Sequence, residues 1–92
     1  MADSSPAISH LKQLGLTAGE AQVYLATLQE AGSKSVSAYK VAQSLGKDPA
    51  NVGKSLSALE RQGAVRVVQD RPRLYLPVPP EEFTEAVLDR LK

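Results

Sequence analysis

Apolar residues recur at every third or fourth position up to residue 62, which is the spacing of amphipathic helices. Glycines and helix-capping residues divide this part of the chain into segments, each with one apolar stripe. The pattern therefore predicts four helices, at about residues 5–14, 17–31, 37–45 and 49–62.

The period of the pattern changes after Gly63. Residues 64–68 and 74–76 are rich in β-branched and aromatic side chains, and the turn cluster 69–72 separates them. These features predict a β-hairpin, whose second strand ends at the prolines that follow. The last segment predicts an amphipathic helix with one stripe formed by Phe83, Val87, Leu88 and Leu91.

Residues 37–62 have the spacing of two helices joined by a tight turn. Ala42, Gly46 and Val52 fall at relative positions 0, +4 and +10. The small residue lets the helices cross closely, the glycine supplies a left-handed turn, and the valine buries the second helix against the first. The apolar stripe of the first helix is predicted to contain Tyr39, Val41, Ala42 and Leu45.

Two such helices followed by a hairpin predict an α+β fold that is mainly α. The predicted architecture is a winged helix-turn-helix with a two-stranded β-hairpin wing and an amphipathic C-terminal helix. No linker or repeat interrupts the pattern, so we expect residues 1–92 to form a single domain. The expected bounds are about 37–62 for the helix-turn-helix, 64–78 for the wing and 80–92 for the C-terminal helix.

Composition excludes several classes of function. The chain has no cysteine and one histidine, His10, and it carries no nucleophile motif, phosphate-cradling glycine loop or metal-ligand spacing. We therefore expect no catalysis, no metal and no cofactor, and we expect no small-molecule effector site in this chain. No apolar run approaches the roughly 20 residues that span a membrane, so a cytoplasmic protein without a membrane partner is expected.

Positive charge is concentrated in the middle of the chain. Residues 37–76 hold seven basic and three acidic side chains, a net charge of +4, whereas the whole chain carries only +1. The two flanks are therefore slightly acidic. Such an asymmetry favours an anionic partner for the helix-turn-helix and the wing.

The helix predicted at 49–62 has the chemistry of a recognition helix. Its expected buried stripe is Val52, Leu56 and Leu59. The other side is short, polar and basic, as entry into the major groove of DNA requires, and an amide can pair with adenine while cations reach guanine or phosphate. The alternative is that the cations are ordinary solvated charges. The outward residues are Ala50, Gly53, Lys54, Ser57 and Arg61, with Asn51 on the flank.

Gly53 is unexpected, because a glycine inside a helix costs roughly 1 kcal/mol relative to alanine. One explanation is that the missing side chain lets the helix approach the groove wall or a phosphate. The other is close packing against the preceding helix near Ala42. The sequence does not separate the two.

The tip of the hairpin supplies further cations. Arg71 and Arg73 flank Pro72, which stiffens the turn, and Arg66 is expected to point outward from its strand. Such a tip suits phosphates or the adjacent minor groove, although a charged hairpin also prevents edge-to-edge pairing. Together with the turn residue Lys47, the predicted DNA-binding residues are Lys47, Ala50, Asn51, Gly53, Lys54, Ser57, Arg61, Arg66, Arg71 and Arg73.

The two terminal helices predict a homodimer. The stripe of the last helix continues to the end of the chain with nothing after it to cover it, and the first helix offers apolar partners. The alternative is that the two helices pack within one chain. The predicted dimerisation residues are Ile8, Leu11, Phe83, Val87, Leu88 and Leu91.

These features predict a transcriptional regulator that binds double-stranded DNA in a sequence-specific manner. The helix 49–62 would enter the major groove, and the wing would contact the backbone or the minor groove. The alternative is a winged helix that serves as a protein–protein interaction module of a larger transcription or replication complex.

Three segments resemble the N-terminal winged-helix domain of TrmB-like transcriptional regulators, namely LKQLGLTAGEAQVYLATLQEAG, VAQSLGKDPANVGKSLSALERQGAVRVV and RPRLYLPVPPEEF. The resemblance runs from Leu11 to Phe83. It implies a DNA-binding regulator, usually dimeric, with the fourth helix as recognition helix. Family members usually carry an aromatic residue where Gly53 stands and often arginine where Pro49 stands, so the operator contacts of relatives do not transfer. They also usually continue into a large effector-binding domain.

Overall fold

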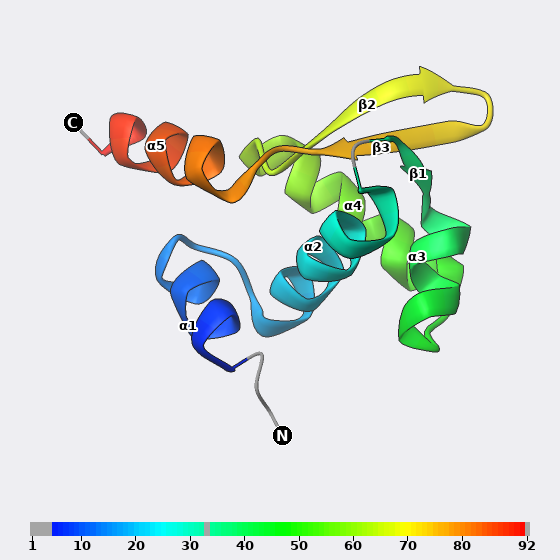
Figure 1. The fold of residues 1–92 in the computed structure, drawn as a ribbon, viewed down its shortest axis with the longest axis horizontal. Coiled ribbons are helices and arrows are strands. Elements are labelled where there is room, and N and C mark those ends of the chain that lie inside the picture. The colour runs from blue at the N-terminus through cyan, green and yellow to red at the C-terminus, as the bar shows by residue number, and fades with distance from the viewer. Residues whose placement is uncertain (1–4, 33, 92) are drawn as a thin grey trace.

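The computed structural model, which describes residues 5–32 and 34–91, is a winged helix and confirms the predicted fold class. Helices α1 to α4 form the body, the hairpin of β2 and β3 projects from it as the wing, and α5 lies at the other end near α1 (Figure 1). The elements are α1 (Ser5–Gln13), α2 (Ala18–Ala31), β1 (Val36–Ser37), α3 (Ala38–Leu45), α4 (Pro49–Gln62), β2 (Val65–Asp70), β3 (Arg73–Pro77) and α5 (Pro80–Arg90).

Local signals in the sequence set the helix ends. The capping box before α2 is complete, because Glu20 N donates to Thr17 Oγ1 and Thr17 N donates to Glu20 Oε1, both at 3.0 Å. Gly46 ends α3 in the left-handed conformation, with φ 66° and ψ 35°. Asp48 occupies the position before α4, but its side chain makes no capping hydrogen bond.

The sheet has a strand that the sequence analysis did not predict. The strand order is β1-β3-β2, and the pairing of β1 with β3 places Val36 opposite Tyr75 and Ser37 opposite Leu74. Both pairings in the sheet are antiparallel. In β2, the register shifts between Val67 and Gln69, so the residue between them forms a bulge and its side chain is exposed.

The core joins α5 to the body through two aromatic rings. Phe83 and Tyr24 are both 0% exposed, and their ring centroids lie 5.7 Å apart at an interplanar angle of 54°. The Tyr24 hydroxyl donates to the backbone oxygen of Val78. Burial, and after it the charge of Glu81, raises the pKa of Tyr24 to about 12, so this hydroxyl stays protonated as a donor.

This packing corrects four of the six residues predicted for the dimer surface. Leu11, Phe83 and Val87 are buried within the chain, and Ile8 is partly buried against the same core. They are therefore core residues of one chain, because α5 packs against α2 of the same chain and no second copy is needed to cover them. Leu88 and Leu91 remain exposed, at 52% and 77%.

The other end of α5 is attached by polar groups. The Arg90 guanidinium donates to the backbone oxygen of Gln62, the last residue of α4, at 3.0 Å. The Gln62 amide in turn donates to Glu20 Oε1 at 3.2 Å, the same oxygen that accepts from Thr17 N in the capping box. Hydrogen bonds thus connect the end of α5 to the end of α4, and the end of α4 to the beginning of α2.

The predicted stripe of α3 is wrong at one position. Val41 and Ala42 are buried and Leu45 is partly buried, as expected. Tyr39, however, is 62% exposed. This aromatic ring therefore belongs to the surface and not to the core.

Candidate nucleic-acid interface

The buried stripe of α4 determines which residues the helix presents outward. Val52, Leu56 and Leu59 are at most 1% exposed, as the sequence predicts. Because a helix advances about 100° per residue, positions 50, 54 and 61 share the opposite side. The structure leaves Ala50, Asn51, Lys54 and Arg61 exposed, with Gly53 and Ser57 half-buried.

The space around Gly53 separates the two explanations of this glycine. A Cβ atom built on Gly53 would have no atom from beyond its own stretch of helix within 4 Å. Close packing against α3 therefore does not require a glycine here. Of the two explanations, only approach of the helix to an external partner still accounts for the missing side chain.

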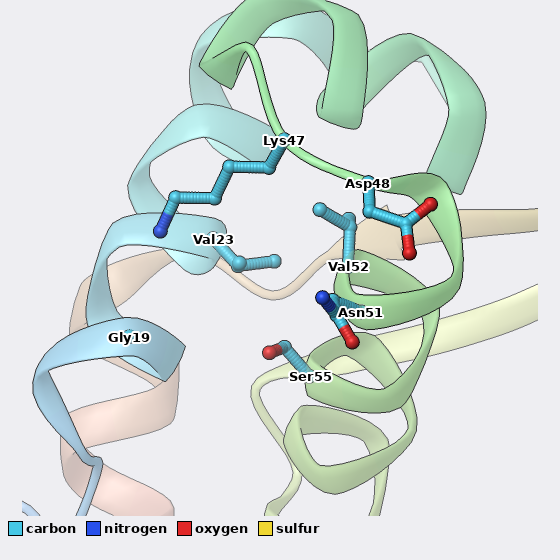
Figure 2. Close-up of a pocket in the computed structure, with 7 residues that line it drawn as sticks. All are labelled: Gly19, Val23, Lys47, Asp48, Asn51, Val52 and Ser55. Carbon is cyan, nitrogen blue, oxygen red and sulfur yellow. The ribbon is translucent and has the colours of Figure 1, made fainter.

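Asn51 and Lys47 lie beside a shallow hollow between α2 and α4, of about 270 Å³ (Figure 2). The Asn51 and Ser55 side chains leave α4 on the side that faces α2, as Figure 2 shows. Lys47 extends across Val23, and its Nζ donates to Gln22 Oε1 at 3.1 Å. These residues thus form a flank of α4 next to its outward side. The lining consists of Gly19, Val23, Lys47, Asp48, Asn51, Val52 and Ser55.

The tip of the wing is ordered by a side chain that the sequence analysis did not single out. The Gln69 amide donates to the backbone oxygens of Arg71 and Pro72, at 3.4 and 3.3 Å. Arg73 pairs with Asp70 across the turn at 3.5 Å. The Arg71 side chain is exposed and makes no hydrogen bond or ion pair in the described part of the chain.

Arg66 faces outward, as predicted, but it has a partner from a distant element. Its guanidinium pairs with Glu82 Oε2 at 3.3 Å, which connects β2 to the first turn of α5. The two side chains are 68% and 57% exposed, so the pair contributes little to stability. Arg66 is nevertheless partly neutralised, and it lies at the base of the wing and not at the tip.

The predicted cations therefore form two groups. We call the first group the free cations, because within residues 5–32 and 34–91 their side chains make no hydrogen bond or ion pair, and the second the engaged cations, because each contacts another side chain. The free cations are Lys54, Arg61 and Arg71, and the engaged cations are Lys47, Arg66 and Arg73.

Among the described residues, no group of three or more His, Cys, Asp or Glu side chains is placed to hold a metal ion. None of the helices in those residues is both long enough and apolar enough to cross a bilayer.

Comparison with known proteins gives one family and one relative. The family model described as "Sugar-specific transcriptional regulator TrmB" matches residues 11–81. The "HTH-type sugar sensing transcriptional regulator TrmBL1" of Pyrococcus furiosus is 36% identical over 84 residues. That alignment covers 91% of this chain and 24% of the relative, so the chain spans about a quarter of that protein's length. No solved structure matches the chain significantly.

Proposed function

Because the chain belongs to the TrmB family of transcriptional regulators, we propose that it binds double-stranded DNA in a sequence-specific manner, with α4 in the major groove. The observation that carries this proposal is the outward side of α4. Lys54 and Arg61 stand there without partners among the described residues, beside Ala50 and a glycine with open space around it. Small residues let the helix approach the groove, and the cations supply contacts to phosphates or guanine.

The wing is proposed to contact the backbone or the adjacent minor groove. Arg71 supports this role, because its charge is exposed at the tip and is not neutralised by another described side chain. Gln69 holds the backbone of the tip in place through its two hydrogen bonds. The guanidinium is thus carried by an ordered turn, which lowers the entropy lost when it binds a phosphate.

Titration of the protein with mixed-sequence duplex DNA at several salt concentrations tests the proposal. A DNA-binding protein that contacts phosphates releases counterions, so the affinity is expected to fall linearly with salt on a double-logarithmic plot. Selection from a random duplex library is then expected to yield a sequence that binds more tightly than the mixed pool. Failure to bind any duplex at low salt would favour a winged helix that docks onto another protein.

Gly53→Ala is expected to stabilise the domain and weaken DNA binding. The added methyl group enters open space, so helix propensity alone acts and raises the free energy of unfolding by up to about 1 kcal/mol. On DNA, the same methyl group would meet the groove wall. Thermal melting and a duplex titration of the variant measure the two effects. A more stable variant with unchanged affinity would contradict the close approach of α4 to DNA at this position.

We also propose that the protein forms a homodimer through the exposed end of α5. Leu88 lies in the last turn of α5 and Leu91 directly follows the helix with helical backbone angles, so the two exposed side chains lie on one side and form an apolar patch. A two-fold axis through this patch would pair two copies of α4 for half-sites about one DNA turn apart.

Leu88→Ser together with Leu91→Ser is expected to convert the dimer to a monomer in sedimentation experiments at tens of micromolar. Both side chains are exposed in the single chain, so the monomer should change in stability by no more than about 0.5 kcal/mol. Val68→Ser is the matched control, because Val68 is also an apolar residue and 51% exposed but lies on the wing. A monomeric parent protein would refute the dimer.

A further inference from the structure

Tyr39 is an exposed aromatic residue at the first turn of α3, where the sequence pattern places a core residue. An isolated exposed apolar side chain is ordinary and needs no explanation. Tyr39 is of interest because of where it lies on α3. It precedes the buried Ala42 by three residues, so it lies next to the buried stripe of α3, but in the first turn, where its side chain is exposed.

The beginning of α3 is attached to the wing. Ser37, the residue directly before α3, pairs with Leu74 of β3, and Leu74 follows the tip residue Arg73. The Ser37 hydroxyl also accepts from Lys40 N at 3.2 Å, which fixes the first turn of the helix. On its other side, α3 packs against α4. Tyr39 follows the paired residue Ser37 by two positions, on a helix that connects the strand beside the wing to α4. The tip of the wing and the outward side of α4 are the two surfaces that are proposed to contact DNA.

We propose that the Tyr39 hydroxyl donates a hydrogen bond to a phosphate of the DNA backbone. This inference rests on the proposed DNA binding and adds a contact that no charge pattern indicates. The first helix of a helix-turn-helix crosses the DNA backbone, and tyrosine is one of the side chains that donate to phosphate oxygens there. Within the described residues the hydroxyl has no hydrogen-bond partner, so it is available to an external acceptor.

Tyr39→Phe removes only the hydroxyl group and is the decisive variant. We expect it to bind both the selected sequence and mixed-sequence duplex about tenfold more weakly, the loss typical of a hydrogen bond to a charged acceptor. The slope of affinity against salt is expected to stay unchanged, because a neutral donor releases no counterion. The melting temperature of the free protein should not change, since the hydroxyl has no partner among the described residues.

Ser44→Ala is the matched control. It removes an exposed hydroxyl group from the same helix, five residues further on and thus on a different side. Its DNA affinity should equal that of the parent protein. A Tyr39→Phe variant that binds like the parent would overturn the phosphate contact and leave the proposed DNA binding intact. A loss confined to the selected sequence would overturn it in favour of a base contact. A parent protein that binds no duplex would overturn both proposals.

Discussion

Phe83→Ala is expected to lower the free energy of unfolding by about 3–5 kcal/mol, as is typical when a fully buried aromatic ring is removed. Phe83 is 0% exposed and packs against Tyr24 with ring centroids 5.7 Å apart. Removal of the ring leaves a cavity between α5 and α2. Water can then reach the hydrogen bond between the Tyr24 hydroxyl and the backbone oxygen of Val78. Chemical denaturation followed by circular dichroism measures the change.

The same experiment distinguishes a core residue from a dimer contact. If Phe83 belongs to the core of one chain, the loss of stability should not depend on protein concentration, whereas an interface residue gives a concentration-dependent midpoint. Val68→Ala is the control, because Val68 is 51% exposed and lies on the wing, outside the proposed dimer surface, and its loss should stay within about 0.5 kcal/mol. A change below about 1 kcal/mol for Phe83→Ala would contradict the packing of α5 on α2.

Replacing all three free cations by alanine is expected to have the largest effect on DNA binding. If Lys54, Arg61 and Arg71 each contact one phosphate, the slope of log affinity against log salt should fall in magnitude by about 2.7, at about 0.9 for each contact. At about 0.1 M salt this corresponds to a loss of roughly several hundredfold. The loss should be similar on selected and mixed-sequence DNA to the extent that the contacts are to phosphates.

The engaged cations supply a control with the same change in net charge. Replacing Lys47, Arg66 and Arg73 by alanine also removes three positive charges, but Gln22, Glu82 and Asp70 already contact these side chains. This variant should therefore lose less affinity than the variant without the free cations. Its slope of log affinity against log salt should also change less. Equal losses for both triple variants would show that the overall electrostatic field drives binding, and the assignment of contacts to the free cations would be wrong.

The fold could be predicted because its signals are local. The capping box of Thr17 and Glu20, the glycine that ends α3 and the proline that begins α4 each act within one helical turn. The change from a helical to a β period after Gly63 likewise needs only neighbouring residues. The bounds of the helices and of the wing therefore follow from the sequence to within a few residues.

Features that depend on distant parts of the chain could not be predicted. Strand β1 has only two residues, too few to show a period, and it exists because β3 pairs with it. The partners of Arg66 and Lys47 lie 16 and 25 residues away. In α5, the pattern shows one stripe, and only the packing of α2 decides that Phe83 is covered and Leu88 is not.

The open space around Gly53 also affects how the sequence of this domain can change during evolution. At a packed position, a larger side chain forces its neighbours to adjust, so a change of sequence needs compensating changes elsewhere. At position 53 a new side chain meets no other part of the fold within 4 Å. Under the proposed DNA binding, a single substitution there would alter the surface offered to DNA while the scaffold stays intact. If α4 enters the major groove as proposed, position 53 is a place where target preference and folding can evolve independently.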